Sequence, residues 1–213
     1  MKFAMSYSCG KDSTLALHKM LEQGHEPVCL IVMLNREVER SYFHGADLKM
    51  LERYEKALGI PMILCPSDGQ GYAAALERGL RQAAAMGARA ACFGDIDIER
   101  NRRWEEERCR AVGLEAFFPL WQRGREENVY ELIELGYHCL IKSINTSLLP
   151  RPLLGSWLDR RAADMIKEAG ADVCGENGEY HTLVLDGPIF RQPLAFHTGN
   201  VLSFGGYAVI DVW

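Results

Sequence analysis

Apolar residues in the first two thirds of the chain form short continuous runs that alternate with segments of helical period. The runs predict strands at 3–8, 28–34, 62–65, 90–93 and 139–144. The segments between them predict helices at 13–23, 46–58, 72–86, 102–112 and 128–135. Alternating helices and continuously apolar strands are typical of an α/β fold, with a parallel twisted sheet covered by helices on both faces.

A glycine follows each of these predicted helices. The glycines are Gly24, Gly59, Gly87, Gly113 and Gly136. Helices commonly end with a left-handed residue at this position, which favours glycine. Right-handed crossovers then bring the carboxyl ends of the strands to one edge of the sheet, where ligands of such folds bind.

The pattern changes after residue 145. Residues 148–159 are irregular and rich in proline and leucine, and a helix is predicted at 160–169. Short β-like runs follow at 181–185, 202–204 and 207–212. We therefore expect an α/β domain over residues 1–145. A smaller α+β region over residues 146–213 is expected to pack on the active edge and bind the substrate.

Composition and charge exclude several classes of protein. The net charge of −5 argues against a broad nucleic-acid surface. The arginines at 100–110 alternate with glutamates, which predicts paired side chains on a solvated helix face. The chain has no apolar run of the ~18 residues that a membrane span needs, and its start does not resemble a secretion signal.

The cysteines indicate a reducing compartment. All 7 are scattered along the chain and form no CxxC pair, which argues against a zinc site, an iron–sulfur cluster or a disulfide framework. We expect buried, reduced thiols and a cytoplasmic protein.

The segment from Ser8 to Ser13, Ser-Cys-Gly-Lys-Asp-Ser, lies between the first predicted strand and helix. A helix start presents free backbone N–H groups and a positive dipole to a phosphate. Gly10 permits a close backbone approach, Lys11 adds positive charge, and Asp12 can hold magnesium. The segment is not a Walker A motif, because Met5 stands where the first glycine belongs. The alternative is a plain serine-capped helix start.

Two further places carry candidate chemistry. Asp95, in Gly94-Asp95 at the end of a predicted strand, can bind a ribose hydroxyl or magnesium, or simply cap the next helix. In the loop at 176–181, Glu176 and Glu179 can bind magnesium or attract ammonium, and His181 can accept a proton. The alternative for this loop is a surface turn. His44 is a weaker candidate at the same edge.

The Ser8–Ser13 segment resembles the SGGxDS PP-loop of the N-type ATP pyrophosphatases, which have a HUP-like, adenine nucleotide alpha-hydrolase-like fold. Five other segments, in order along the chain, resemble the diphthine–ammonia ligase family. They are Gly94-Asp95-Ile96, Arg103-Trp104-Glu105, Pro119-Leu120-Trp121, the stretch Cys-Gly-Glu-Asn-Gly-Glu-Tyr-His-Thr at 174–182, and Leu185-Asp186-Gly187-Pro188. One departure is Cys9, which replaces the first glycine of the loop.

This resemblance implies an ATP- and Mg²⁺-dependent ligase that adenylates a carboxylate, releases pyrophosphate and forms an amide with ammonia. It assigns nucleotide binding to Ser8, Cys9, Gly10, Lys11, Asp12, Ser13, Gly94 and Asp95. It assigns catalysis to Lys11, Asp12, Glu176, Glu179 and His181, with Asp12 as the metal ligand.

The resemblance also implies partners. The acceptor would be diphthine on translation elongation factor 2, or another carboxylate in a bacterial host. Free ammonium is the expected nitrogen donor, because Lys2 stands where glutamine-using ligases often carry a cysteine. The alternatives are a tRNA-modifying enzyme of the same superfamily and a nucleotide-binding sensor without chemistry. The sequence is also compatible with a homodimer.

Overall fold

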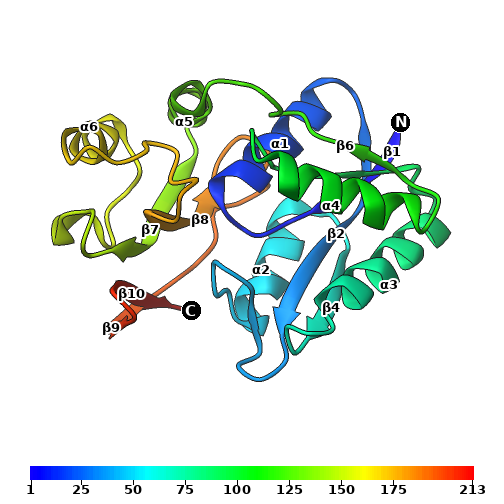
Figure 1. The fold of residues 1–213 in the computed structure, drawn as a ribbon, viewed down its shortest axis with the longest axis horizontal. Helices are drawn as coiled ribbons and strands as arrows, with labels where there is room; N and C mark the ends of the chain where they lie inside the picture. The colour runs from blue at the N-terminus through cyan, green and yellow to red at the C-terminus, as the bar shows by residue number, and fades with distance from the viewer.

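Five parallel strands form the larger sheet of the computed structural model, which describes residues 1–213 (Figure 1). Their spatial order is β4 (Met62–Ser67), β2 (Glu26–Asn35), β1 (Lys2–Ser6), β5 (Ala90–Cys92) and β6 (Glu115–Phe117). The short β3 (Arg40–Ser41) pairs antiparallel with the end of β2. Strands are added on one side of β1 and then on the other, so the switch point of the sheet lies between β1 and β5.

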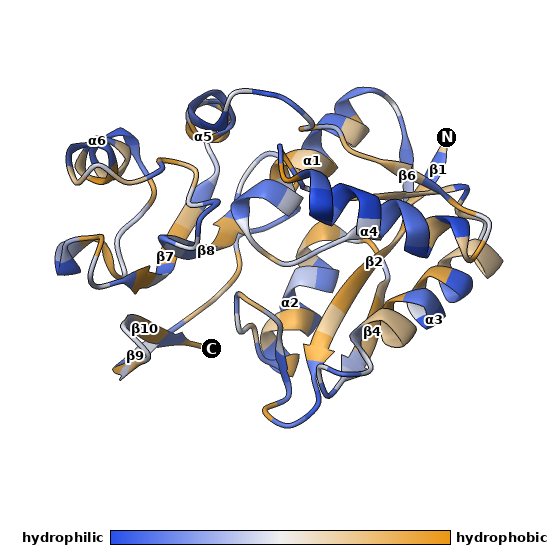
Figure 2. Ribbon diagram, viewed as in Figure 1, coloured by the Kyte–Doolittle hydropathy of each residue, from blue (hydrophilic) through white to orange (hydrophobic).

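Helices cover both faces of this sheet, as predicted. The helices α3 (Tyr72–Ala85) and α4 (Glu99–Arg110) pack on one face, and α1 (Lys11–Glu22) and α2 (Leu48–Leu58) on the other. In β1, Phe3 and Met5 belong to one hydrophobic cluster and Ala4 to the other, as strand geometry requires. Figure 2 shows β2 as largely apolar and α4 as strongly hydrophilic.

The predicted glycine helix ends are confirmed. The five glycines that follow the first five helices have φ angles between 66° and 99°. At the end of α2, for example, Gly59 is left-handed and its N–H donates to the Glu55 carbonyl.

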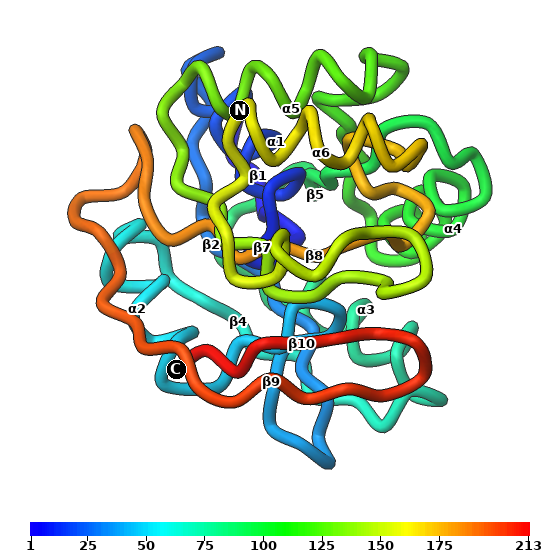
Figure 3. Tube along the Cα trace, turned by 90° about the vertical axis from the view of Figure 1, so that its left-hand side faces the viewer, coloured from blue at the N-terminus to red at the C-terminus, as the bar shows by residue number.

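A second sheet is antiparallel, with the order β8 (Tyr180–Asp186), β7 (His138–Asn145), β10 (Tyr207–Val212) and β9 (Thr198–Phe204). The β9–β10 hairpin, red in Figure 3, ends the chain and forms one edge of this sheet. The helices α5 (Arg125–Glu134) and α6 (Arg160–Glu168) contact one another above it, and the 3₁₀ turn η1 (Arg151–Leu153) contacts β7 (Figure 1). None of the helices is long and apolar enough to cross a membrane.

The expectation that residues 139–144 belong to the parallel sheet is wrong. They form most of β7, which pairs antiparallel with β8 and β10. Cys139 to Ser143 are all buried, so the strand has the continuous burial of a parallel strand although its partners are antiparallel. The second sheet therefore contains residues from both sides of position 145.

The two sheets meet at the loop after β1. One hydrophobic cluster extends from α1 and α2 into β7 and β8. Two hydrogen bonds join β8 directly to the loop: Val184 N–H donates to the Cys9 carbonyl (2.9 Å), and Lys11 N–H donates to Thr182 Oγ1 (3.1 Å). The candidate phosphate loop is therefore supported by residues more than a hundred positions away.

Candidate functional site

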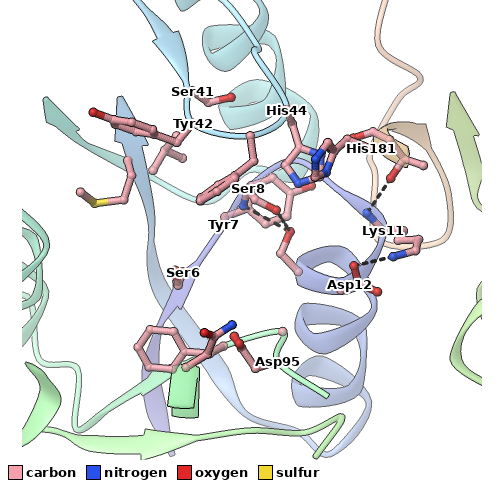
Figure 4. Close-up of a pocket in the computed structure, with 18 of the residues that line it drawn as sticks. Ser6, Tyr7, Ser8, Lys11, Asp12, Ser41, Tyr42, His44, Asp95 and His181 are labelled. Carbon is pink, nitrogen blue, oxygen red and sulfur yellow. Dashed lines mark hydrogen bonds and ion pairs between the residues drawn. The ribbon is translucent and has the colours of Figure 1, made fainter. Parts of the chain in front are cut away.

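A cavity of about 370 Å³ opens at the carboxyl ends of β1 and β5 (Figure 4). It brings together most of the residues that the sequence predicted. These are Ser8, Lys11, Asp12, Ser13, Gly94, Asp95, Glu176 and His181, together with His44. Cys9, Gly10 and Glu179 do not line it.

The loop after β1 is held in shape by its own hydroxyl groups. The Ser8 and Ser13 hydroxyls lie 3.0 Å apart, and Ser13 donates to the Gly10 carbonyl at 3.1 Å. The N–H groups of Asp12 and Ser13, in the first turn of α1, have no acceptor within the protein. The start of α1 thus offers free amide donors at the cavity, as an anion site requires.

Cys9 is in the left-handed region, with φ 68°, which is uncommon for any residue but glycine. Its side chain is fully buried in the hydrophobic cluster, and burial raises the pKa of the thiol well above its usual value. The Cys9 side chain therefore does not reach the cavity. The residue contributes to the loop through its left-handed backbone and its carbonyl, which accepts from Val184 N–H.

Gly10 and Gly94 each permit a close approach. A Cβ on Gly10 would lie 2.3 Å from His44 Cε1. A Cβ on Gly94 would lie 2.8 Å from the backbone nitrogen of Ser13 and 2.9 Å from the carbonyl carbon of Asp12. The end of β5 therefore packs directly on the loop backbone, where any side chain would separate the two.

Lys11 and Asp12 form an ion pair with 2.7 Å between Nζ and Oδ2. Burial alone would lower the pKa of Lys11, but Asp12 and the neighbouring acidic groups outweigh it and raise the pKa well above its usual value. Lys11 is therefore a fixed positive charge in the wall of the cavity.

Asp12, Cys174 and Glu176 place one donor atom each within 4.8 Å of one another. Burial, and then the charge of Asp12, raise the pKa of Glu176 to about 7. Magnesium prefers carboxylate oxygens to a thiol, so Asp12 and Glu176 are the pair that fits it. Cys174 Sγ lies 3.7 Å from Asp12 Oδ1. The sequence predicts Cys174 only as a buried thiol. Its place two residues before Glu176 was the one feature of the sequence that could have indicated a position at the cavity.

Glu179 organises its own loop. Its carboxylate accepts hydrogen bonds from Asn177 N–H (3.0 Å), Asn177 Nδ2 (3.1 Å) and Asp172 N–H (3.3 Å). Its side chain is buried and turned away from the cavity. In this geometry Glu179 acts on the cavity through the placement of Glu176.

His44 and His181 lie side by side, with ring centroids 5.3 Å apart (Figure 4). His44 Nδ1 donates to the Thr182 carbonyl at 2.6 Å, which leaves Nε2 as an acceptor. Burial and the neighbouring His181 lower the pKa of His44 to about 3, and burial and Lys11 lower that of His181. Both imidazoles are therefore neutral near pH 7.

Asp95 lies across the cavity from the two histidines (Figure 4). The carboxyl group of Glu105, which also lines the cavity, is its neighbour. Burial, followed by the charge of Asp95, raises the pKa of Glu105 to about 10, and burial raises that of Asp95. At neutral pH Glu105 is thus a neutral acid that can donate to Asp95. Its Oε2 is buried and has no hydrogen-bond partner, as suits a ligand group.

The arginine-rich helix face is only partly as expected. Arg102 pairs with Glu106 and Arg103 with Glu99, each at 2.8 Å and four residues apart. Glu105 was expected among these solvated pairs, and that expectation is wrong because its side chain turns into the cavity. The resemblance of Arg103-Trp104-Glu105 to the family was the feature that could have indicated a role for Glu105 at the site, whereas the charge pattern of the helix did not.

Sequence comparisons match two family models to this chain. The family model described as diphthamide synthase N-terminal domain matches residues 1–116, and the one described as diphthamide synthase C-terminal domain matches residues 124–211. A relative from Homo sapiens named diphthine–ammonia ligase is 24% identical over the whole chain and 89% of its own length.

Two other relatives carry the same name. The Bos taurus protein is 31% identical over 56% of this chain and 46% of its own length. The Schizosaccharomyces pombe protein is 24% identical over 95% of this chain, which spans 37% of that longer protein. With both domain models matched in order, the chain belongs to the diphthamide synthase family.

Proposed function

We propose that this protein is an ATP-dependent ligase that converts a carboxylate into an amide with ammonia. One observation carries the proposal: free amides of a PP-loop, a strand-end aspartate and an acidic, histidine-containing loop border the same cavity. A simple nucleotide sensor needs the first two features and has no use for the third.

In the first step the acceptor carboxylate attacks the α-phosphorus of ATP. A bond forms between the carboxylate oxygen and phosphorus, and the bond to the β-phosphate oxygen breaks. Lys11 and the amides of Asp12 and Ser13 bind the pyrophosphate that leaves. Asp12 and Glu176 would hold magnesium, which neutralises charge on the phosphates.

In the second step ammonia attacks the acyl carbon of the adenylate, and AMP leaves with the electrons of the broken C–O bond. The nitrogen enters as ammonium and gives up two protons by the time it is an amide. His181 is neutral and at the cavity, so it can accept the first proton; the second passes to water.

Asp95 suits the ribose of the nucleotide. It follows a strand at the switch point of the sheet, where a carboxylate can accept hydrogen bonds from ribose hydroxyls. The unpaired Glu105 Oε2 beside it offers a further polar contact.

The names of the relatives support diphthine as the acceptor. We propose that this diphthine is carried by elongation factor 2, as the family resemblance implies. The reducing cytoplasm is the compartment we propose, because all 7 cysteines are free and buried thiols.

The test is a product analysis with ATP, Mg²⁺, ¹⁵N-ammonium and elongation factor 2 that carries diphthine. We expect AMP, pyrophosphate and ¹⁵N-labelled amide in equal amounts. Formation of ADP and phosphate, or recovery of unchanged ATP with bound protein, would refute the ligase assignment.

A further inference from the structure

A second cavity, of about 260 Å³, adjoins the first one. It lies between the loop after β3 and the antiparallel sheet. Phe43, His44 and His181 line both cavities, so the two meet at the imidazole pair. The other lining residues are Lys142, Ser143, Phe204, Tyr207 and Val209.

A β-bulge places Lys142 and Ser143 in the wall of this cavity. Neighbouring side chains on a regular strand point to opposite faces of the sheet. Here Ile141 pairs with Thr182 and Ser143 pairs with His181, so Lys142 is an extra residue without a partner on β8. Bulges of this kind redirect side chains and are frequent next to active sites.

Both polar groups have unused hydrogen-bonding capacity. Lys142 Nζ donates to the Gly45 carbonyl at 2.7 Å, and no carboxylate lies within ion-pair distance of it. Asp211, an acidic residue of the same sheet that acts on the charge of Lys142, is paired with Arg40 at 3.0 Å. Ser143 Oγ is buried and has no partner.

An unpaired ammonium in this position is costly. Burial, followed by the charge of Arg40, lowers the pKa of Lys142 to about 8. An anion that supplies a counter-charge would relieve this cost, and a carboxylate can accept from an ammonium and a hydroxyl at once. The aromatic rings of Phe204 and Tyr207 would contact the part of the acceptor next to this carboxylate.

We propose that the second cavity is the acceptor subsite, in which Lys142 and Ser143 bind the carboxylate that is to be adenylated. This inference rests on the proposed ligase function. The acceptor and ATP then enter from different sides and meet beside His44 and His181. The PP-loop holds the nucleotide, and the bulge of β7 holds the carboxylate.

The kinetic test compares Lys142→Met and Ser143→Ala with wild type, with diphthine-bearing elongation factor 2 as the acceptor. For Lys142→Met we expect the acceptor KM to rise about 10-fold or more, because a charge-assisted bond is lost, while the KM for ATP stays within about 2-fold. Ser143→Ala should give a smaller rise, and Lys142→Arg should restore part of the loss. Lys167→Met, which removes an exposed lysine paired with Glu126, is the matched control and should change neither KM.

A direct binding test separates this proposal from the ligase function. Acetate is titrated into protein labelled with ¹³C at lysine Cε, and the Lys142 signal is identified by its loss in Lys142→Met. We expect the Lys142 signal to shift and its pKa to rise as acetate binds. An unperturbed signal, or an unchanged acceptor KM in an active Lys142→Met variant, overturns the subsite. An inactive wild type that still binds acetate at Lys142 overturns only the ligase assignment.

Discussion

Lys11 Nζ lies 2.7 Å from Asp12 Oδ2, so the two charged groups of the candidate phosphate loop are bonded to each other. In the reaction we propose, they have separate partners: Lys11 binds the departing pyrophosphate and Asp12 binds magnesium. Binding of magnesium–ATP therefore has to exchange one short ion pair for two new contacts. Each of the two residues restrains the other until the nucleotide arrives.

Asp12→Ala should abolish pyrophosphate release. It removes one of two carboxylates at the metal position and frees Lys11 to bind phosphate without a metal. We expect nucleotide to bind still, and catalysis to fall at least about 100-fold, as for loss of a group that stabilises charge in the transition state. Pyrophosphate release and circular dichroism spectra measure activity and folding separately. A fully active, folded variant would remove Asp12 from the mechanism.

Magnesium affinity should rise with pH through the region near 7. Burial and Asp12 raise the pKa of Glu176 to about 7, and its protonated form cannot bind the metal. Calorimetric titration of magnesium–ATP at several pH values measures this rise. Glu176→Gln should flatten the profile, and a profile that is equally steep in both proteins would contradict the assignment.

The same group should lower the stability of the metal-free protein as pH rises. Because the folded-state pKa lies above the ordinary 4.5, the folded protein binds more protons than the unfolded chain between these two values. Stability therefore falls as pH rises from about 4.5 to about 7. Thermal unfolding across this range should show a smaller decrease in Tm for Glu176→Gln than for wild type.

Cys9→Gly should destabilise the protein less than Cys9→Val, although valine is closer to cysteine in size. Glycine relieves the left-handed backbone at φ 68° but loses a buried thiol, so we expect a net change within about 1 kcal/mol and unchanged nucleotide binding. Valine keeps the apolar side chain but is branched at a positive φ, and should destabilise by more than about 2 kcal/mol. Urea unfolding measures both. A stable valine variant would show that the backbone at this residue is not constrained.

Gly94→Ala should weaken ATP binding while the protein remains folded. The added methyl group would lie within 3 Å of the backbone at Asp12 and Ser13, and must push the end of β5 away from the loop. Gly124→Ala is the control, because its nearest contact is Glu127 Cβ at 3.3 Å, which is farther than the contacts at Gly94, and Gly124 does not line the cavity. Equal ATP affinities for the two variants, measured by calorimetry, would show that the loop tolerates displacement.

Glu179→Ala should spare ATP binding and reduce amide formation. The Glu179 carboxylate holds the Asn177 and Asp172 backbone amides, so its loss should loosen the loop that carries Glu176. The yield of ¹⁵N-amide and the dissociation constant for ATP are measured on the same preparation. A normal yield would restrict Glu179 to a structural role in folding.

Local chemistry made much of the fold predictable. The glycines after the helices follow from the geometry of single elements, and this prediction is confirmed. The partner of β7 was not predictable in this way, because a strand that is buried on both faces has the same apolar pattern in either kind of sheet. Pairing depends on contacts distant in sequence, which periodicity does not contain.

In the site, too, the local features were predictable and those that depend on distant contacts were not. The candidate phosphate loop and Asp95 could be predicted to border one cavity because each lies at a strand end, where ligands of such folds bind. Glu105 was hidden by the charged residues around it, and Lys142 by an apolar strand. The side chain of Lys142 reaches a cavity because of a one-residue bulge, which appears only when β7 and β8 are paired.

Two hydrogen bonds join the halves of the chain at the nucleotide loop, one from Val184 to Cys9 and one from Lys11 to Thr182. They have an evolutionary consequence. A recombination event that replaced the C-terminal half would also detach the supports of the nucleotide loop. New acceptor specificities in this lineage should therefore arise by point substitution within the existing halves, and chimaeras that join halves from distant relatives should lose ATP affinity together with acceptor recognition.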